Sequence, residues 1–228
     1  MNHTAARPRT ATYARGEDTR SRLIEAAIEA FGTYGYDATS TRRLAEQAGT
    51  TLPSIQYYFG GKEGLYRAAV EHIAHSMNER MAPVAERVNV ALRKSTLRRG
   101  EILELLNQLL DGFIALMMSE DRDSRKRFLS RAESERSVAL DLFRESIRRQ
   151  VVQPAAALIG RLIGQPADDA HVLLRTVAIV GQVSVFCHIG AQRALGWQEF
   201  SDEQVRTVQS VIREHTEAIL NAVTRKKK

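Results

Sequence analysis

A pair of short helices bounded by glycines is the feature that most constrains how this chain can fold. Ser40 can cap a helix over residues 41 to 48, because its hydroxyl can accept a backbone N–H that the first turn leaves unpaired. Gly49 ends this helix, since glycine adopts the left-handed conformation at little cost. The sequence therefore predicts a short helix followed at once by a tight turn.

A second short helix follows that turn. Thr51 can cap it, and Pro53 stands in its first turn, where a missing N–H costs little. We expect it over residues 52 to 58, because the Gly60-Gly61 pair breaks it before Lys62 opens a longer helix. Helix, tight turn and short helix is the helix-turn-helix pattern, in which the second helix lies in the major groove of DNA.

The second helix carries side chains that suit such a groove. Its hydroxyl, amide and phenol groups can bond to bases or phosphates, and Leu52 and Pro53 can contact a thymine methyl. Ile55 and Phe59 are expected to face the core. The predicted DNA-binding residues are Arg42, Arg43, Thr51, Leu52, Pro53, Ser54, Gln56, Tyr57, Tyr58 and Lys62. Spacing alone leaves open an ordinary helical hairpin with half-buried tyrosines.

A longer match favours the DNA-binding interpretation. The segment from Thr19 to Leu65 resembles the DNA-binding domain of TetR/AcrR-type transcriptional regulators. The matching residues are Thr19-Arg20, Ile24, Ala26-Ala27, Phe31, Gly35-Tyr36, Thr39-Ser40, Arg42, Leu44-Ala45, Ala48-Gly49, Ile55, Tyr58-Phe59, Lys62-Glu63 and Leu65. The family usually has a phosphate-binding tyrosine where this chain has Gln56, so more of that contact is expected from Tyr57 and Tyr58.

Composition excludes several other classes of protein. No apolar run approaches the roughly 18 to 20 residues that a membrane span needs, and the arginine-bearing N-terminus has no apolar stretch typical of a secretory signal. Cys187 is the one cysteine, which excludes an intramolecular disulfide and a multi-cysteine zinc site. We expect a cytoplasmic protein that does not bind membranes.

Net charge is a weaker guide to DNA binding than the sequence motif. The chain carries +6 in total, but residues 1 to 66 hold eight Lys and Arg against seven Asp and Glu. The basic excess is therefore not concentrated in the predicted DNA-binding part. Residues 1 to 16 are expected to form a flexible basic arm, since they lack apolar periodicity and contain no acid.

The rest of the chain also has helical periodicity. Apolar residues recur at spacings of three and four over residues 17–34, 62–81, 84–97, 101–118, 137–163, 168–195 and, after a cap at Ser201, to the C-terminus. Gly100 is read as a break, Pro83 as a kink or a joint, and Pro154 as a kink. We predict an all-α fold: a three-helix helix-turn-helix domain over residues 17–66 (the motif at about 40–59) and a larger helical ligand-binding and dimerisation domain over 67–228.

Two features of the C-terminal part indicate, respectively, a homodimer and a ligand domain. Its last two long helices are more apolar than one small domain needs, so a four-helix interface between two copies would bury them. The sequence near residues 183 to 197, together with the stretch from Thr51, resembles the CecR-type branch of the family. That branch has its own C-terminal ligand domain, which implies a small-molecule effector.

The predicted effector site is mostly apolar. Its candidates are Phe113, Met117, Phe143, Arg144, Gln182, Phe186 and His188, although each could equally fill the core. No catalytic residue, cofactor or metal site is predicted. His72 and His75 share a helical face but have no third ligand in view, and Cys187 and His188 point about 100 degrees apart in a helix.

These observations predict a dimeric repressor that a small molecule releases from a pseudo-palindromic operator in double-stranded DNA. Its two recognition helices must lie about 34 Å apart, or a multiple, to enter successive major grooves. A ligand that favours another separation lowers DNA affinity by its differential binding. Two alternatives stay open: an all-α interaction module whose helix-turn-helix is only structural, and a small-molecule enzyme.

Overall fold

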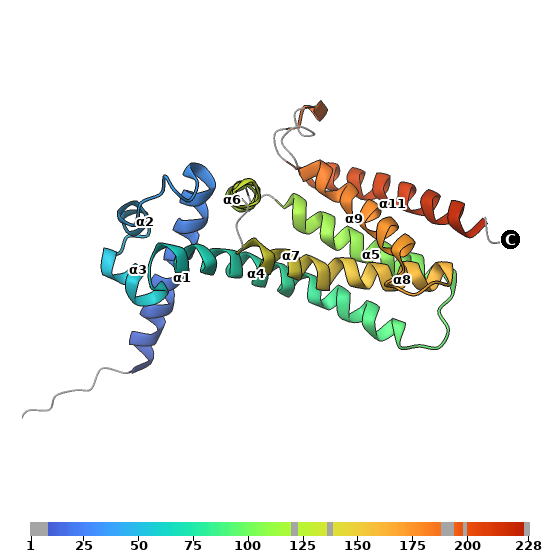
Figure 1. Cartoon of the computed structure of the whole chain (residues 1–228), viewed down its shortest axis with the longest axis horizontal. Coiled ribbons are helices and arrows are strands. Elements are labelled where there is room, and N and C mark those ends of the chain that lie inside the picture. The colour runs from blue at the N-terminus through green and yellow to red at the C-terminus, as the bar shows by residue number, and fades with distance from the viewer. Residues whose placement is uncertain (1–8, 120–122, 136–138, 188–193, 198–199, 226–228) are drawn as a thin grey trace, which may run out of the picture. The chain divides into compact units, whose positions relative to one another are not determined.

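The computed structural model consists of helices (Figure 1). It describes residues 9–119, 123–135, 139–187, 194–197 and 200–225. The side chains of residues 9–15, 123, 187 and 225 are not described. The all-α fold predicted from the sequence is confirmed, and these ranges contain no strand. Contacts divide the chain into two compact units. The first contains Met1–Ala74 and Arg122–Phe143, and the second contains His75–Asp121 and Arg144–Lys228.

The first unit packs a small helical core. Its elements are α1 (Arg9–Tyr34), α2 (Thr41–Gln47), α3 (Leu52–Phe59), the first part of α4 (Lys62–Leu92) and α6 (Asp123–Ser134). Leu23 and Phe31 of α1, Leu44 of α2, Ile55 of α3 and Leu65 of α4 are all buried in one cluster. Burying each such side chain stabilises the unit by about 1.5–3 kcal/mol, so these residues fix the positions of α2 and α3.

α6 belongs to this core although it lies far along the chain. A Cβ atom at Gly32 of α1 would lie 2.9 Å from the carbonyl oxygen of Ser124 and 3.0 Å from the nitrogen of Phe128, so glycine permits this close approach. The buried ring of Phe128 lies 6.2 Å from that of Phe31 and 5.0 Å from that of Tyr66. Residues 122–143, which the sequence suggested for the C-terminal domain, therefore pack with the first unit.

The second unit is a bundle around α5. Its other elements are the rest of α4, α7 (Leu140–Ile147) from Arg144 on, the π-helical segment η2 (Arg148–Val152), α8 (Gln153–Ile163), α9 (Ala170–Cys187) and α11 (Asp202–Arg225). α5 (Arg99–Met118) contacts α8, α9 and α11, and Figure 1 shows these helices side by side. In the described ranges, no helix is long and apolar enough to cross a membrane.

Pro154 explains the irregular segment before α8. Proline has no N–H, so the carbonyl group of Gln150 loses its normal helical partner. The helix widens at η2, where the N–H of Gln153 donates to the carbonyl oxygen of Arg148, five residues back. The kink expected at this proline therefore takes the form of a π-helical turn.

Two other expected boundaries were wrong, those at residues 9 to 16 and at Gly100. α1 begins at Arg9, so residues 9 to 16 are helical rather than a flexible arm; once past Pro8, this stretch has no helix breaker before Gly16. Residues 1 to 8 of the expected arm lie outside the described residues. α4 continues through Pro83, which is exposed, where water can satisfy a freed carbonyl group. Gly100 lies inside the first turn of α5, which a backbone N–H of Arg98 bonded to Glu101 (2.8 Å) helps to fix.

Gly64 should be essential for the step from α3 to α4. A Cβ atom there would lie 1.8 Å from the carbonyl oxygen of Phe59, which is backbone and cannot rotate away. We expect Gly64→Ala to lower the free energy of unfolding by about 1–3 kcal/mol or more, measured by urea denaturation. Gly100→Ala is the matched control: it meets open space in a helix and should stabilise by about 0.5–1 kcal/mol. Equal stability of both variants would contradict this reading of Gly64.

Candidate nucleic-acid interface

The turn between α2 and α3 is built by local signals. The Oγ atom of Ser40 accepts the N–H of Arg43 at 3.2 Å and so caps α2. Gly49 in the turn has φ +59°, and Gly60 ends α3 with φ +71°. Thr51 stands at the N-cap position of α3, but its side chain makes no cap bond to the backbone. The two helices are therefore confirmed at the expected positions, although the cap expected from Thr51 is not made.

The hydroxyl of Thr51 instead joins a small network at the start of α3. Its Oγ1 lies 3.1 Å from the Oγ of Ser54, and the hydroxyl of Thr50 donates to the same Ser54 oxygen at 3.0 Å. These groups sit where the first N–H groups of α3 lack helical partners. Hydroxyls and free N–H groups at a helix start together suit a phosphate oxygen.

α3 has one face in the core and one in solvent. Ile55 is 1% exposed, whereas Tyr57 is 82% and Leu52 53% exposed. Pro53 and Gln56 are exposed as well. Large side chains such as Tyr57 are usually buried at least in part, so packing within the fold does not explain why Tyr57 and Leu52 are exposed.

Tyr58 has a mixed environment. Its ring is half-buried and packs against the core of the first unit, with the ring of Tyr57 at 4.9 Å in an edge-to-face arrangement. A Cβ atom at Gly16 of α1 would lie 3.4 Å from its hydroxyl oxygen. Tyr58 therefore helps to attach α3 to α1 while its hydroxyl stays near the surface.

Lys62 is held in place at the start of α4. Its Nζ atom lies 4.3 Å from the ring centroid of Tyr36 and donates to the carbonyl oxygen of Asp37 at 3.5 Å. Burial, and then the carboxylates of Glu63 and Asp37, raise the pKa of the Tyr36 hydroxyl above its ordinary value. The Tyr36 ring therefore stays neutral beneath the ammonium group of Lys62. This ammonium group lies next to the end of α3 and has further N–H donors available for a ligand.

The two arginines of α2 differ in their surroundings. Arg42 forms an exposed ion pair with Glu46 at 2.9 Å, which contributes little to stability and leaves the guanidinium accessible. The guanidinium of Arg43 lies 4.3 Å from the ring centroid of Tyr34 on α1. Both cations are exposed and thus open to a phosphate group.

Arg22 is a residue that the sequence analysis missed. Its Nη1 atom donates to the carbonyl oxygen of Ala48 at 2.9 Å, and its Nε atom pairs with Asp18 at 3.1 Å. The side chain thus ties α1 to the carbonyl that ends α2. No local pattern marks this role, because the partners are 26 residues apart.

Arg131 of α6 does the same at the other end of α1. It donates through Nε to the carbonyl oxygen of Gly32 and through Nη2 to that of Thr33, both at 2.9 Å. These carbonyls lie at the helix end and lack helical partners. Arg127 adds an ion pair with Glu29 at 3.2 Å. α6 is thus fixed to α1 by polar contacts as well as by its buried phenylalanine.

The predicted effector residues are not gathered in one place. Phe113 is buried in the second unit, whereas Phe143 packs against the core of the first. Arg144 is exposed, and Met117 and Phe186 are half-buried. Gln182 lies 3.0 Å from the Nδ1 atom of His215. His188 lies outside the described residues.

The histidines pair with carboxylates rather than with each other. His72 lies 3.2 Å from Glu25, and His75 lies 3.4 Å from Glu79. Within the described part of the chain, no group of three metal-ligating residues comes together. An open hollow of about 490 Å³ on the first unit involves none of the predicted effector residues; it is lined by Ser21, Arg22, Glu25, Ala26, Glu29, Gln47 and Ala48.

Comparisons with known families match both parts of the chain. Residues 23–69 match the model of bacterial regulatory proteins of the tetR family. Residues 102–223 match the C-terminal domain of the HTH-type transcriptional dual regulator CecR. The CecR protein of Shigella flexneri is 32% identical over 219 residues, which cover 93% of this chain and 96% of that protein.

Solved structures show the same fold. A regulator from Pseudomonas aeruginosa PAO1 superposes with a TM-score of 0.63 at 14% identity, over 92% of this chain and 93% of that one. The transcriptional regulator FadR from Bacillus subtilis, solved in complex with stearoyl-CoA, gives a TM-score of 0.58 at 17% identity, over 85% and 95%. At such identities the likeness concerns the fold alone.

Arg22 provides a test of how the turn is held. Arg22→Met keeps the aliphatic stem but removes the donors to Ala48, so we expect the free energy of unfolding to fall by about 1–2 kcal/mol. Arg67→Met, which removes an exposed pair with Glu71, should cost less than about 0.5 kcal/mol. Urea denaturation measures both, and an equal loss would show that the bond to Ala48 adds nothing.

Proposed function

Since the chain belongs to the TetR family of bacterial transcriptional regulators, in the group that shares the CecR C-terminal domain, we propose that it is a dimeric repressor. In this proposal it leaves a pseudo-palindromic operator when a small molecule binds its second unit. TetR-family regulators bind DNA operators and small molecules and typically form dimers. The matched families and relatives are regulators rather than enzymes, which disfavours the alternative of a small-molecule enzyme.

The observation that carries the DNA-binding part is the solvent face of α3. Tyr57 is 82% exposed on the side of α3 opposite Ile55, and Leu52, at the start of the helix, is 53% exposed. In the major groove, Leu52 and Pro53 would contact thymine methyl groups, while Gln56 and Tyr57 would hydrogen-bond to base edges. These contacts would supply the sequence specificity of the repressor.

Groups around α3 would bind the sugar–phosphate backbone. Lys62, held by Tyr36 at one end of α3, would meet one phosphate, and the hydroxyls of Thr51 and Ser54 at the other end would meet a second. Arg42 and Arg43 on α2, with the hydroxyl of Tyr58, would add contacts that orient the domain. Such contacts fix register on the duplex but carry no sequence information.

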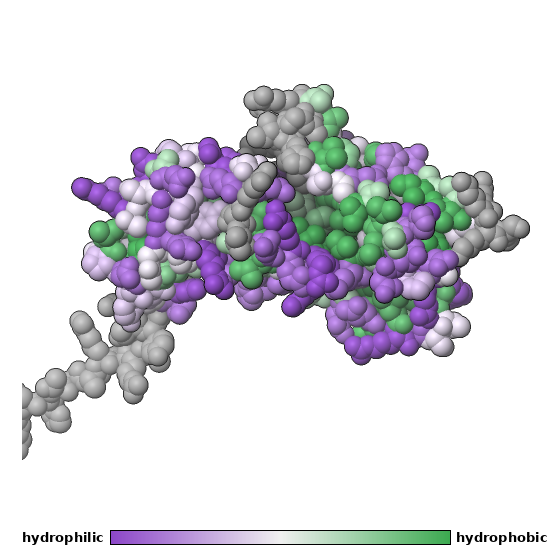
Figure 2. Space-filling model, in the orientation of Figure 1, coloured by the Kyte–Doolittle hydropathy of each residue, from purple (hydrophilic) through white to green (hydrophobic). Residues whose placement is uncertain are grey.

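The dimer would form through α9 together with α11. Leu174 is 67%, Val177 60% and Val185 55% exposed, and they follow one face of α9 at helical spacing. Gly181 on this face has open space in front of it, which would allow close approach of a second helix. Figure 2 shows apolar surface gathered over α9. An apolar patch of this kind is typical of an obligate interface.

The effector would bind in the second unit. Phe113, Met117 and Phe186 are the apolar candidates there, and Arg144, Gln182 and His188 are the polar ones. Phe143, which packs against the core of the first unit, is no longer among the candidates. The FadR structure holds stearoyl-CoA, so a ligand with a long acyl chain is a reasonable first probe for this fold. α6, which follows α5 in the chain and packs on α1, would transmit its binding.

A second mode of action has one observation in its favour. The relative from Shigella flexneri is named a dual regulator, so this chain could also activate some promoters. Both modes need the same DNA-binding face, and they differ in operator position and in the sign of the ligand effect.

Operator binding is the first measurement. Purified protein is titrated onto the intergenic DNA upstream of its own gene, with scrambled competitor at two salt concentrations. We expect competitor-resistant binding that Tyr57→Ala weakens by about tenfold or more, since one good base contact contributes about 1–3 kcal/mol. Tyr57 is 82% exposed, so the thermal unfolding midpoint should not change.

The variant Tyr57→Phe keeps the aromatic ring but removes the hydroxyl. Comparing it with Tyr57→Ala separates the contribution of the hydroxyl to DNA binding from that of the apolar ring. Wild-type binding that is weak, steeply salt-dependent and equal on scrambled DNA would mean backbone attraction only, and would count against this operator. Unchanged affinity of Tyr57→Ala would count against α3 as the reading helix.

The dimer interface has a matched pair of variants. Val177→Asp places a charge in the proposed interface, and we expect the dimer dissociation constant to rise at least about 100-fold, because the carboxylate would be buried without a partner. Val90→Asp on α4 alters a valine that is 49% exposed outside the proposed interface, and should leave the dimer intact. Sedimentation velocity measures both; a Val177→Asp protein that stays dimeric would exclude this face.

A further inference from the structure

The positive charge of the chain is concentrated in two segments outside the helix-turn-helix. Residues 87 to 99 contain Arg87, Arg93, Lys94, Arg98 and Arg99, and residues 218 to 228 end in Arg225-Lys-Lys-Lys. These segments carry nine positive charges and no negative charge, so all other residues together carry −3 against the total of +6.

The fold brings these two segments to the same end of the second unit. Arg99, in the first turn of α5, donates to the side chains of Asn221 and, at 3.3 Å, Thr224 in the last turns of α11. The start of α5 therefore lies beside the last described turns of α11.

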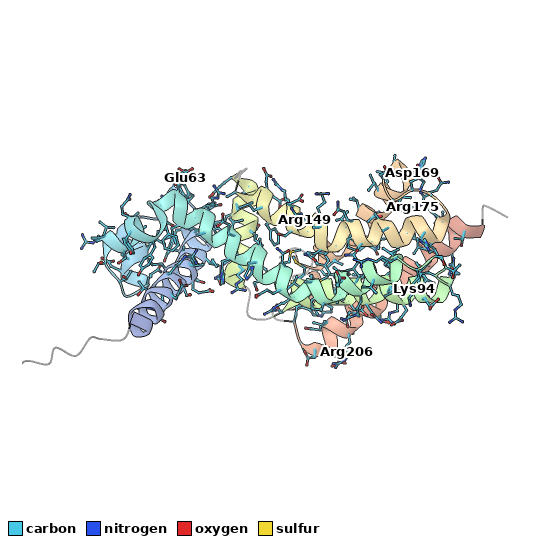
Figure 3. The ribbon with its side chains drawn as sticks, turned by 90° about the horizontal axis from the view of Figure 1, so that it is seen from below. Glu63, Lys94, Arg149, Asp169, Arg175 and Arg206 are labelled. Carbon is cyan, nitrogen blue, oxygen red and sulfur yellow. The ribbon has the colours of Figure 1, made fainter. Side chains whose placement is uncertain are left out.

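Little negative charge opposes these cations. Glu101 pairs with Arg98 at 3.3 Å; bonds from the backbone N–H and side chain of Arg98, with smaller effects of the charges on Arg98 and Lys94, lower its pKa. Figure 3 shows Asp169 toward the same end of this unit as Lys94, but its carboxylate accepts the N–H groups of His171 and Val172 and so caps α9. Among the described residues, Arg93 has no hydrogen-bond or ion-pair partner.

The backbone beneath these side chains is held by hydrogen bonds from another helix. Arg161 of α8 donates to the carbonyl oxygens of Leu92, Lys94 and, at 2.7 Å, Ser95, at the end of α4. These are carbonyls that a helix end leaves unpaired. The connection thus presents its cations from a fixed position, which lowers the entropy cost of binding a partner.

We propose that Arg93, Lys94, Arg98 and Arg99, here called the basic patch, form a second DNA-binding surface that contacts the sugar–phosphate backbone without reading sequence. It goes beyond the operator contacts of α3, and would hold the regulator on non-operator DNA or on a second duplex segment. Three of its four residues are arginines, whose planar guanidinium groups bind phosphate through two parallel bonds.

DNA fits this surface better than a lipid bilayer. Stable binding to anionic membranes usually combines basic residues with an inserted apolar anchor or a lipid. Leu92 and Leu97 are half-buried, and the exposed apolar side chain just before residues 91–100 is a single valine, Val90, at 49%. A protein that works on DNA is also surrounded by phosphates at high local concentration.

The test compares salt dependence on a scrambled duplex, for which α3 has no preferred sequence. Each phosphate contact adds about 0.9 to the slope of log affinity against log salt. We expect Arg93→Gln/Lys94→Gln in the full-length chain to reduce this slope by about 1.8. Arg80→Gln/Arg206→Gln removes the same charge from exposed positions elsewhere and should leave the slope unchanged.

Three results would overturn the proposal. An equal reduction in both double variants would mean that only net charge matters, and an unchanged slope in the patch variant would exclude the contact. Patch-dependent binding to phosphatidylglycerol vesicles with an unchanged duplex slope would assign the surface to membranes instead. Repeating the series in a Tyr57→Ala background keeps the test separate, since loss of operator specificity there concerns α3 alone.

Discussion

The approach of α6 to α1 at Gly32 is the contact on which the arrangement of this protein depends. A side chain at that position would displace the backbone of Ser124 and Phe128. With glycine there, Arg131 can reach the carbonyls that end α1, and Phe128 can enter the core. The matched C-terminal family domain covers residues 102–223, so α6 belongs to that domain by sequence and to the DNA-binding unit by packing. A ligand that moved the ends of α6 would have to act on α1 or break these contacts.

The helix-turn-helix itself could be predicted because its signals are local. The hydroxyl cap at Ser40 sets the start of α2, and the glycines with positive φ at positions 49 and 60 follow the ends of α2 and α3. Each signal lies within a few residues of the boundary that it sets. The spacing of Ile55 against Tyr57 then determines which side of α3 is buried. Sequence alone also identified the all-α class, because apolar residues recur with helical spacing along nearly the whole chain.

Long-range contacts could not be predicted in the same way. Arg22 bonds to a carbonyl 26 residues away and Arg131 to one 99 residues away, and nothing near either arginine in the sequence indicates its partner. Gly100 was wrongly expected to end a helix for a related reason. It lies inside α5, since solvent and neighbouring packing decide whether a local penalty ends a helix. Phe143 was grouped with Phe113 on chemistry, although they pack in different units.

The charge distribution sets a limit on how the helix-turn-helix segment, residues 1 to 66, can work. Residues 1 to 66 carry a net charge of only +1, and Arg42 shares its charge with Glu46. Affinity that comes from counterion release grows with the number of phosphates contacted, whereas discrimination comes from base contacts. A nearly neutral helix-turn-helix segment therefore favours discrimination between DNA sequences over general attraction to DNA. If most general attraction to DNA resides in the basic patch of the second unit, search along DNA and recognition of the operator depend on different surfaces, and selection could adjust one without the other.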